Sequence, residues 1–142
     1  MRWTYLIKNI VGFNEKCSQK LNCFNLNPLK LAFLGDAVFE LYIRERLIFK
    51  YDEKLGNLNK RKNELACCKG QSQILDMIFS SLTEDETKVY KKGCNVKIKN
   101  FSKKSSIIDY RRATGLECLL GYLYINGNIE RIEQILEKIH EL

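Results

Sequence analysis

The sequence has little histidine and proline, and it has no long apolar run. Its 142 residues include one histidine, His140, and one proline, Pro28. A single histidine argues against a zinc site and against Ser-His or Cys-His catalysis, because both need histidine beside other functional groups. No stretch reaches the ~18 to 20 apolar residues of a membrane span, and Lys8 interrupts the apolar N-terminal segment. We therefore expect no membrane segment, no signal peptide and a cytoplasmic location.

The cysteines form neither a metal-binding pattern nor a disulfide pattern. They contain no C-x-x-C pair, and two of them are adjacent: Cys17, Cys23, Cys67, Cys68, Cys94 and Cys118. A chain of this length buries roughly two-thirds of its unfolded surface, so it needs no disulfide to support its core. We therefore predict that the thiols are reduced.

The positive charge is concentrated in one segment. The chain has 24 basic and 17 acidic side chains, which give a net charge of +7. Residues 88–112 hold nine of the basic side chains and only one acidic one, and they account for the whole excess. Such a cluster is typical of a surface that binds the phosphate backbone of a nucleic acid. A solvated lysine loop is the alternative interpretation.

Hydrophobic periodicity predicts an all-α protein with five or six helices, because no segment alternates as a strand would. Asn27 and Pro28 suit the N-cap and the first position of a helix. Thr83 and Glu86 form a capping box, and we expect Gly93 to end the helix that follows it. The predicted helices cover residues 27 to about 44–50, about 59–79, 83–92, 107–125 and 129–140, with a loop at 93–106.

Two acidic residues are the only charges in their apolar segments. Asp36 stands alone between residues 31 and 39, and Glu117 stands alone between residues 114 and 128. A carboxylate in apolar surroundings loses hydration unless it is paired or binds a cation. A helix-edge position or a buried arginine would explain each residue separately. Together with the basic segment, they supply oxygen ligands for Mg²⁺ and lysines for phosphates, which phosphodiester hydrolysis requires.

The segments around these acids resemble the ribonuclease III family. Leu31-Ala-Phe-Leu-Gly-Asp-Ala-Val-Phe-Glu40 is similar to its signature helix, and Ala113-Thr-Gly-Leu-Glu-Cys-Leu-Leu-Gly-Tyr-Leu-Tyr124 is similar to its second acidic helix. The resemblance extends over about residues 27–139. A chain with no room for a double-stranded-RNA-binding domain resembles the Mini-III branch of the family, as do segments 82–86, 90–97 and 110–117.

This resemblance implies a homodimeric, Mg²⁺-dependent endoribonuclease that cuts double-stranded RNA and leaves 5′-phosphate ends. It implies that Asp36 and Glu117 are the metal ligands and catalytic residues, and that the substrate is the paired ends of the large-subunit (23S) ribosomal RNA precursor. It divides the chain into an N-terminal extension, residues 1–26, expected to be helical, and a catalytic domain, residues 27–142. The expected RNA-binding residues are Lys91, Lys92, Asn95, Lys97, Lys103, Lys104, Arg111 and Arg112.

Three positions depart from the family pattern. Ala32 and Thr114 stand where classical members carry further acids, although the Mini-III branch resembles this sequence in lacking them. Cys94 stands where an arginine is expected. A catalytically weak or silent RNA-binding module that kept the fold is therefore the alternative function.

Several further assignments stay open at this level. The signature helix is more apolar than one buried stripe requires, and we expect it to contribute Phe33, Phe39, Tyr42 and Ile43 to a dimer interface, with core packing as part of the explanation. Glu40 could orient a metal-bound water or pair with Arg44. Arg111 could contact a phosphate or pair with Asp109 or Glu117.

Overall fold

A computed structural model of the chain describes residues 26–98 and 106–141, and the account below concerns these residues only. Helices and turns make up their regular structure, and no strand occurs among them, so the all-α prediction is confirmed. The helices are α3 (Pro28–Lys50), α4 (Leu55–Ala66), α5 (Cys68–Ile78), α6 (Glu84–Cys94), α7 (Ile107–Ile125) and α8 (Ile129–Leu136), with two 3₁₀ turns, η2 (Phe79–Ser81) and η3 (Glu137–Glu141). Within the described ranges, no helix is long and apolar enough to cross a membrane.

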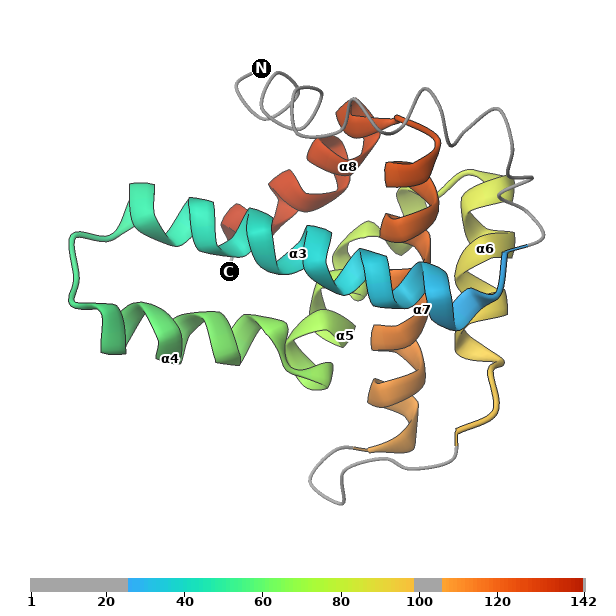
Figure 1. The fold of residues 1–142 in the computed structure, drawn as a ribbon, viewed down its shortest axis with the longest axis horizontal. Helices are drawn as coiled ribbons and strands as arrows, with labels where there is room; N and C mark the ends of the chain where they lie inside the picture. The colour runs from blue at the N-terminus through green and yellow to red at the C-terminus, as the bar shows by residue number, and fades with distance from the viewer. Residues whose placement is uncertain (1–25, 99–105, 142) are drawn as a thin grey trace.

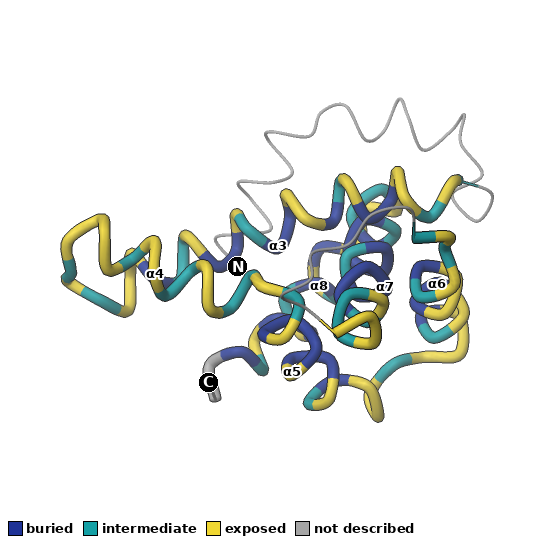
Figure 2. The backbone as a smooth tube through the Cα atoms, turned by 90° about the horizontal axis from the view of Figure 1, so that it is seen from below, coloured by how far each residue is buried: buried dark blue, intermediate teal, exposed yellow. Residues whose placement is uncertain are grey.

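Helix α7 is the centre of the fold. Helix α3 crosses it, and α5 and α6 pack against its other sides (Figure 1). Helix α4 returns alongside α3, and the far ends of these two helices project beyond the rest of the molecule. Figure 2 shows that α7 is largely buried, whereas the outer side of α3 and much of α4 are exposed.

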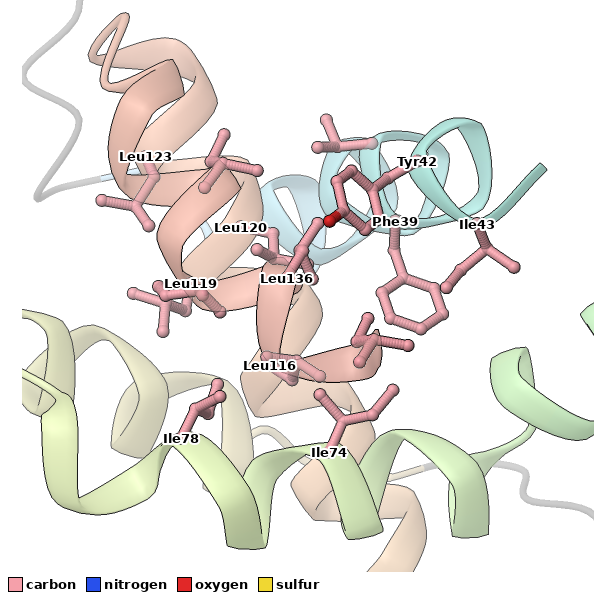
Figure 3. Close-up of a cluster of buried hydrophobic side chains, with 14 of the residues drawn as sticks. Phe39, Tyr42, Ile43, Ile74, Ile78, Leu116, Leu119, Leu120, Leu123 and Leu136 are labelled. Atoms are coloured by element: carbon pink, nitrogen blue, oxygen red, sulfur yellow. The ribbon is translucent and has the colours of Figure 1, made fainter. Parts of the chain in front are cut away.

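The main hydrophobic core lies between α3, α5, α7 and α8 (Figure 3). Each fully buried aliphatic or aromatic side chain in such a core contributes roughly 1.5–3 kcal/mol through the apolar area that it removes from water. The core residues that Figure 3 labels are Phe39, Tyr42, Ile43, Ile74, Ile78, Leu116, Leu119, Leu120, Leu123 and Leu136.

The helix starts predicted at Asn27 and Thr83 are confirmed by their caps. The side chain of Asn27 accepts a hydrogen bond from the backbone N–H of Leu29 at 2.9 Å. Thr83 Oγ1 accepts from the Glu86 N–H at 3.2 Å, and the Glu86 carboxylate accepts from the Thr83 N–H at 2.9 Å, so the capping box is present. Gly127, with φ of 71°, makes the turn between α7 and α8.

The single helix predicted over residues 59–79 is wrong. The structure has two helices there, because Cys67 adopts an extended conformation between α4 and α5. The corner is tight: a Cβ atom on Gly70 would lie 2.3 Å from the carbonyl oxygen of Glu64. Gly70 therefore allows the first turn of α5 to pack against the last turn of α4.

Two other local predictions are also corrected. Gly93 does not end α6, which continues to Cys94. It is buried against α7, where an added Cβ would lie 2.7 Å from Cβ of Cys118. The last predicted helix ends as an α-helix at Leu136 and continues as η3. The expected helical structure of residues 1–26 lies almost wholly outside the described residues.

Candidate active site at the crossing of α3 and α7

Two glycines let the backbones of α3 and α7 come into direct contact. A Cβ atom on Gly35 would lie 1.7 Å from the carbonyl oxygen of Glu117, and a Cβ on Gly121 would lie 2.0 Å from the carbonyl oxygen of Leu31. Real side-chain atoms cannot approach a backbone so closely, so only glycine fits at both positions. This close crossing brings Asp36, which follows Gly35, beside Glu117.

The two carboxyl groups form a pair. Burial raises the pKa of Glu117 to about 7. A hydrogen bond from Gln71 opposes this shift, and the charge and hydrogen bonding of the adjacent Asp36 add to it. Two neighbouring carboxylates repel each other when both are charged. A divalent cation bound between them would neutralise both charges, and carboxylate oxygens are the ligands that Mg²⁺ prefers. The structure thus brings together the two residues that the sequence predicted as metal ligands.

The expectation that Asp36 lies in apolar surroundings is wrong. Asp36 is exposed, whereas Glu117 is partly buried. One side of α3 packs on the core, and Asp36 borders solvent beside the crossing with α7, next to the exposed Phe33 and Ala37. The periodicity did not reveal this because apolar residues occupy both sides of α3.

Gln71 is a member of this site that the sequence analysis missed. Its side-chain Nε2 donates to Glu117 Oε1 at 3.0 Å and to the carbonyl oxygen of Ala66 at 3.3 Å. The residue is 1% exposed. Because the contact joins residues 46 positions apart, no local pattern could have indicated it.

Ala32 and Thr114, two of the three positions that depart from the family pattern, are buried. Ala32 is buried with Leu31, Val89 and Cys118. Thr114 is also buried, and its hydroxyl donates to the carbonyl oxygen of Tyr110 at 3.0 Å. Within residues 26–98 and 106–141, no group of three or more His, Cys, Asp or Glu side chains is placed to hold a metal ion. Asp36 and Glu117 therefore stand as a pair of acids rather than as part of a larger cluster.

Glu40, one turn after Asp36, is held by two basic side chains. Arg44 Nη2 lies 3.0 Å from Glu40 Oε2, and Lys62 Nζ, on α4, lies 3.2 Å from Glu40 Oε1. Burial raises the pKa of Glu40, but Lys62 and Arg44 outweigh this effect, and the pKa is below its usual value. The ion-pair interpretation is therefore favoured over a role in orienting water.

A basic groove lies between the start of α3 and α6. It is open and has a volume of about 550 Å³. Of the residues predicted to bind RNA, Lys91, Lys92 and Asn95 line this groove together, and Lys97 is exposed just beyond it. The complete lining is Pro28, Lys88, Lys91, Lys92, Asn95 and Val96.

The other predicted RNA-binding residues have different environments. Arg111 is exposed, and Arg112 forms an ion pair with Asp76 of α5. Lys103 and Lys104 lie outside the described residues. Cys94, where an arginine was expected, is partly buried, and its Sγ would lie 2.7 Å from a Cβ added to Gly115, so it packs between α6 and α7.

Both the sequence and the fold of this chain are similar to those of known proteins. Residues 29–128 match the Ribonuclease III domain model. A Mini-ribonuclease 3 from Thermoanaerobacter sp. (strain X514) is 37% identical over 132 residues, which is 92% of this chain and 93% of that protein. A Mini-ribonuclease 3 from Brevibacillus brevis is 43% identical over 112 residues, 79% of this chain and 84% of that protein. A crystal structure of a protein from Fusobacterium nucleatum, 31% identical, matches with a TM-score of 0.76 over 82% of this chain and 93% of that one.

Proposed function

The chain belongs to the ribonuclease III family, in its Mini-ribonuclease 3 group, and is therefore an endoribonuclease; we propose that its substrate is double-stranded RNA. We further propose that Asp36 and Glu117 hold the Mg²⁺ ion that cleavage requires. The observation that carries the proposal is the carboxylate pair at the crossing of α3 and α7. Asp36 is exposed and open to a large substrate, whereas Glu117 is partly buried and held by Gln71. The two acids therefore lie side by side but differ in their exposure to solvent and substrate.

The cation supplies two functions when bound: it activates the attacking water and stabilises charge on the transferring phosphoryl group. The chain's own residues provide the rest. Asp36 and Glu117 supply two carboxylates in place of a larger set of acids, and we propose that water or phosphate oxygens complete the coordination. Hydrolysis then leaves 5′-phosphate ends on the products.

Binding of the duplex is assigned to the basic groove beside α6. Lysine side chains neutralise RNA phosphates and make the affinity dependent on salt rather than on sequence. Lys91 and Lys92 are exposed in this groove, and Asn95 offers a polar side chain near the ribose hydroxyls of an A-form duplex. Arg111 adds an exposed cation at the start of α7.

A homodimer completes the proposal, and its interface differs from the one expected. Phe39, Tyr42 and Ile43 are buried in the core of the single chain and cannot form an interface. Phe33 is 85% exposed, and it belongs to an apolar stripe on the outer side of α3 that also contains Leu29, Leu41 and Ile48. A two-fold dimer through this stripe presents one active site to each strand of the duplex.

The proposed substrate is the paired end region of the large-subunit (23S) ribosomal RNA precursor, and the proposed location is the cytoplasm. Membership in the Mini-ribonuclease 3 group supports the proposed substrate. A perfectly paired RNA is a suitable first substrate for the test.

The test is cleavage of an end-labelled RNA duplex by the parent, Asp36→Asn and Glu117→Gln in Mg²⁺. Each variant removes a proposed metal ligand and keeps its shape, so we expect cleavage to fall at least 100-fold while duplex binding stays within a few-fold. Glu130→Gln, at an exposed site on α8, is the matched control and should cut like the parent. Duplex binding without cleavage by the parent would favour the silent RNA-binding alternative, and cleavage by either carboxamide variant at the parent's rate would remove that residue from the site.

A further inference from the structure

The amide of Gln71 is a neutral polar group in contact with Glu117 of the carboxylate pair. It is contributed by the first turns of α5, a third helix beside the crossing of α3 and α7. Its Nε2 bridges Glu117 Oε1, at 3.0 Å, and the carbonyl oxygen of Ala66, at 3.3 Å. One end of the bridge is therefore fixed backbone and the other is the Glu117 carboxylate, so the amide fixes the orientation of that carboxylate.

The carbonyl oxygen of the same amide is a buried acceptor. Gln71 Oε1 has no hydrogen-bond partner among the described residues, and the whole residue is 1% exposed. Buried polar atoms in proteins are nearly always satisfied by protein or by an ordered water. Because this oxygen belongs to the amide that contacts Glu117, a water that satisfied it would lie close to that carboxylate.

A cation held by only two carboxylates would keep several bound waters, and these waters need hydrogen-bond acceptors such as Gln71 Oε1. Mg²⁺ keeps several of its waters when few protein groups ligate it, and those waters need hydrogen-bond acceptors around them. Asp36 and Glu117 are only two carboxylates, and the buried Ala32 and Thr114 add none. A neutral amide can hold Glu117 and accept from water without adding to the negative charge of the site.

We propose that Gln71 is a positioning residue of the cation site, and this inference rests on the proposed function. Its N–H group holds Glu117 in the orientation that binds the divalent cation. Its carbonyl oxygen accepts a hydrogen bond from a water of the cation's hydration shell.

The experiment measures cation binding separately from cleavage. Mn²⁺ is titrated into the RNA-free protein by calorimetry, and the Mg²⁺ concentration for half-maximal cleavage is measured at saturating duplex. Gln71→Met keeps the length of the side chain and loses both hydrogen-bonding functions. We expect it to bind Mn²⁺ about 10-fold or more weakly and to need correspondingly more Mg²⁺, with an unchanged KM for RNA. Gln73→Met, at an exposed position of the same helix, is the control and should match the parent in both measurements.

Gln71→Glu provides a second readout. A third carboxylate at this point repels Glu117, so the thermal midpoint, Tm, of the metal-free variant should be lower than that of the parent. Mn²⁺ should then raise the Tm of the variant more than it raises the Tm of the parent, because the cation compensates the added charge. A carboxylate at this buried point lowers the Tm whatever the role of the native amide, so the recovery by Mn²⁺ is the informative effect, and a position remote from the cation would show no such recovery.

The outcomes separate the two proposals. If Gln71→Met binds Mn²⁺ as tightly as the parent, the positioning role is overturned and the proposed function stands. If Gln71→Met does not fold, the Gln71→Glu variant decides: recovery of its Tm by Mn²⁺ supports the role, and no recovery overturns it. A parent that neither binds Mn²⁺ nor cuts duplex RNA would overturn the proposed function, and this inference with it.

Discussion

Glu86 shows at the scale of one residue how the fold stabilises a buried charge. It is 6% exposed, and its carboxylate is bound at both oxygens by Arg131, at 2.7 Å from Nε and 3.0 Å from Nη2. The Thr83 N–H donates to it as well. Burial raises the pKa of Glu86, but Arg131 and Thr83 outweigh this effect, and its pKa lies below the usual value of 4.5.

A pH-dependent contribution to stability follows from this arrangement. Because the folded-state pKa of Glu86 is lowered, the stabilisation is complete above its unfolded pKa and is lost as the pH falls through the folded pKa. We predict that Glu86→Gln lowers the free energy of unfolding by about 2 kcal/mol at pH 7, and by much less at pH 3. Urea denaturation at both pH values measures this. An equal loss at pH 3 would show that the effect is one of packing rather than charge.

At the residue scale, the sequence predicted contacts between near neighbours in the chain and missed a contact between distant residues. The caps at Asn27 and Thr83 depend on groups two or three residues away, and both were predicted correctly. Asp36 and Glu117 were singled out by their apolar neighbours, yet the structure places only Glu117 in a partly buried position. Gln71 was missed because its partner lies 46 residues away and is brought to it only by tertiary packing.

At the scale of elements, the contact between α3 and α7 decides whether there is a site at all. The bounds of α7 were predicted from its periodicity, because a central helix that is buried on most sides leaves a long apolar pattern. The corner at Cys67 was not predicted, because the sequence on both of its sides is compatible with one continuous helix. The corner depends on the packing of Gly70 against the end of α4.

Alanine substitutions of glycine test the crossing directly. We predict that Gly35→Ala abolishes cleavage and costs several kcal/mol of stability, because its Cβ would lie 1.7 Å from the Glu117 carbonyl oxygen and would force the helices apart. Gly56→Ala is the matched control: nothing lies within 4 Å of its Cβ, and alanine in an exposed helix position stabilises by up to ~1 kcal/mol. Thermal denaturation and duplex cleavage measure both. A Gly35→Ala variant as stable and as active as the parent would refute the close contact.

At the scale of the whole molecule, the exposed stripe on α3 predicts how the chain assembles. Replacing Phe33 with aspartate puts a charge on a surface that we propose is covered by a second copy of the chain. We predict that Phe33→Asp converts the dimer to a monomer in sedimentation or light-scattering experiments. Its helical content should stay unchanged, because Phe33 is 85% exposed in the single chain.

Asp52→Asn is a suitable control, because Asp52 is an exposed residue between α3 and α4 and lies outside the stripe. A parent that is already monomeric at micromolar concentration, or a Phe33→Asp variant that remains dimeric, would rule out this stripe as the interface.

The positions of Phe33 and Asp36 on α3 have a kinetic consequence. The two residues are exposed and three positions apart on one helix, so the proposed dimer interface and the proposed active site are neighbours. In the proposed dimer the two active sites face the two strands, so dilution below the dissociation constant of the dimer would leave one active site on the duplex instead of two. The turnover per chain should then fall as the enzyme is diluted, and the products should shift from double-strand breaks to nicks.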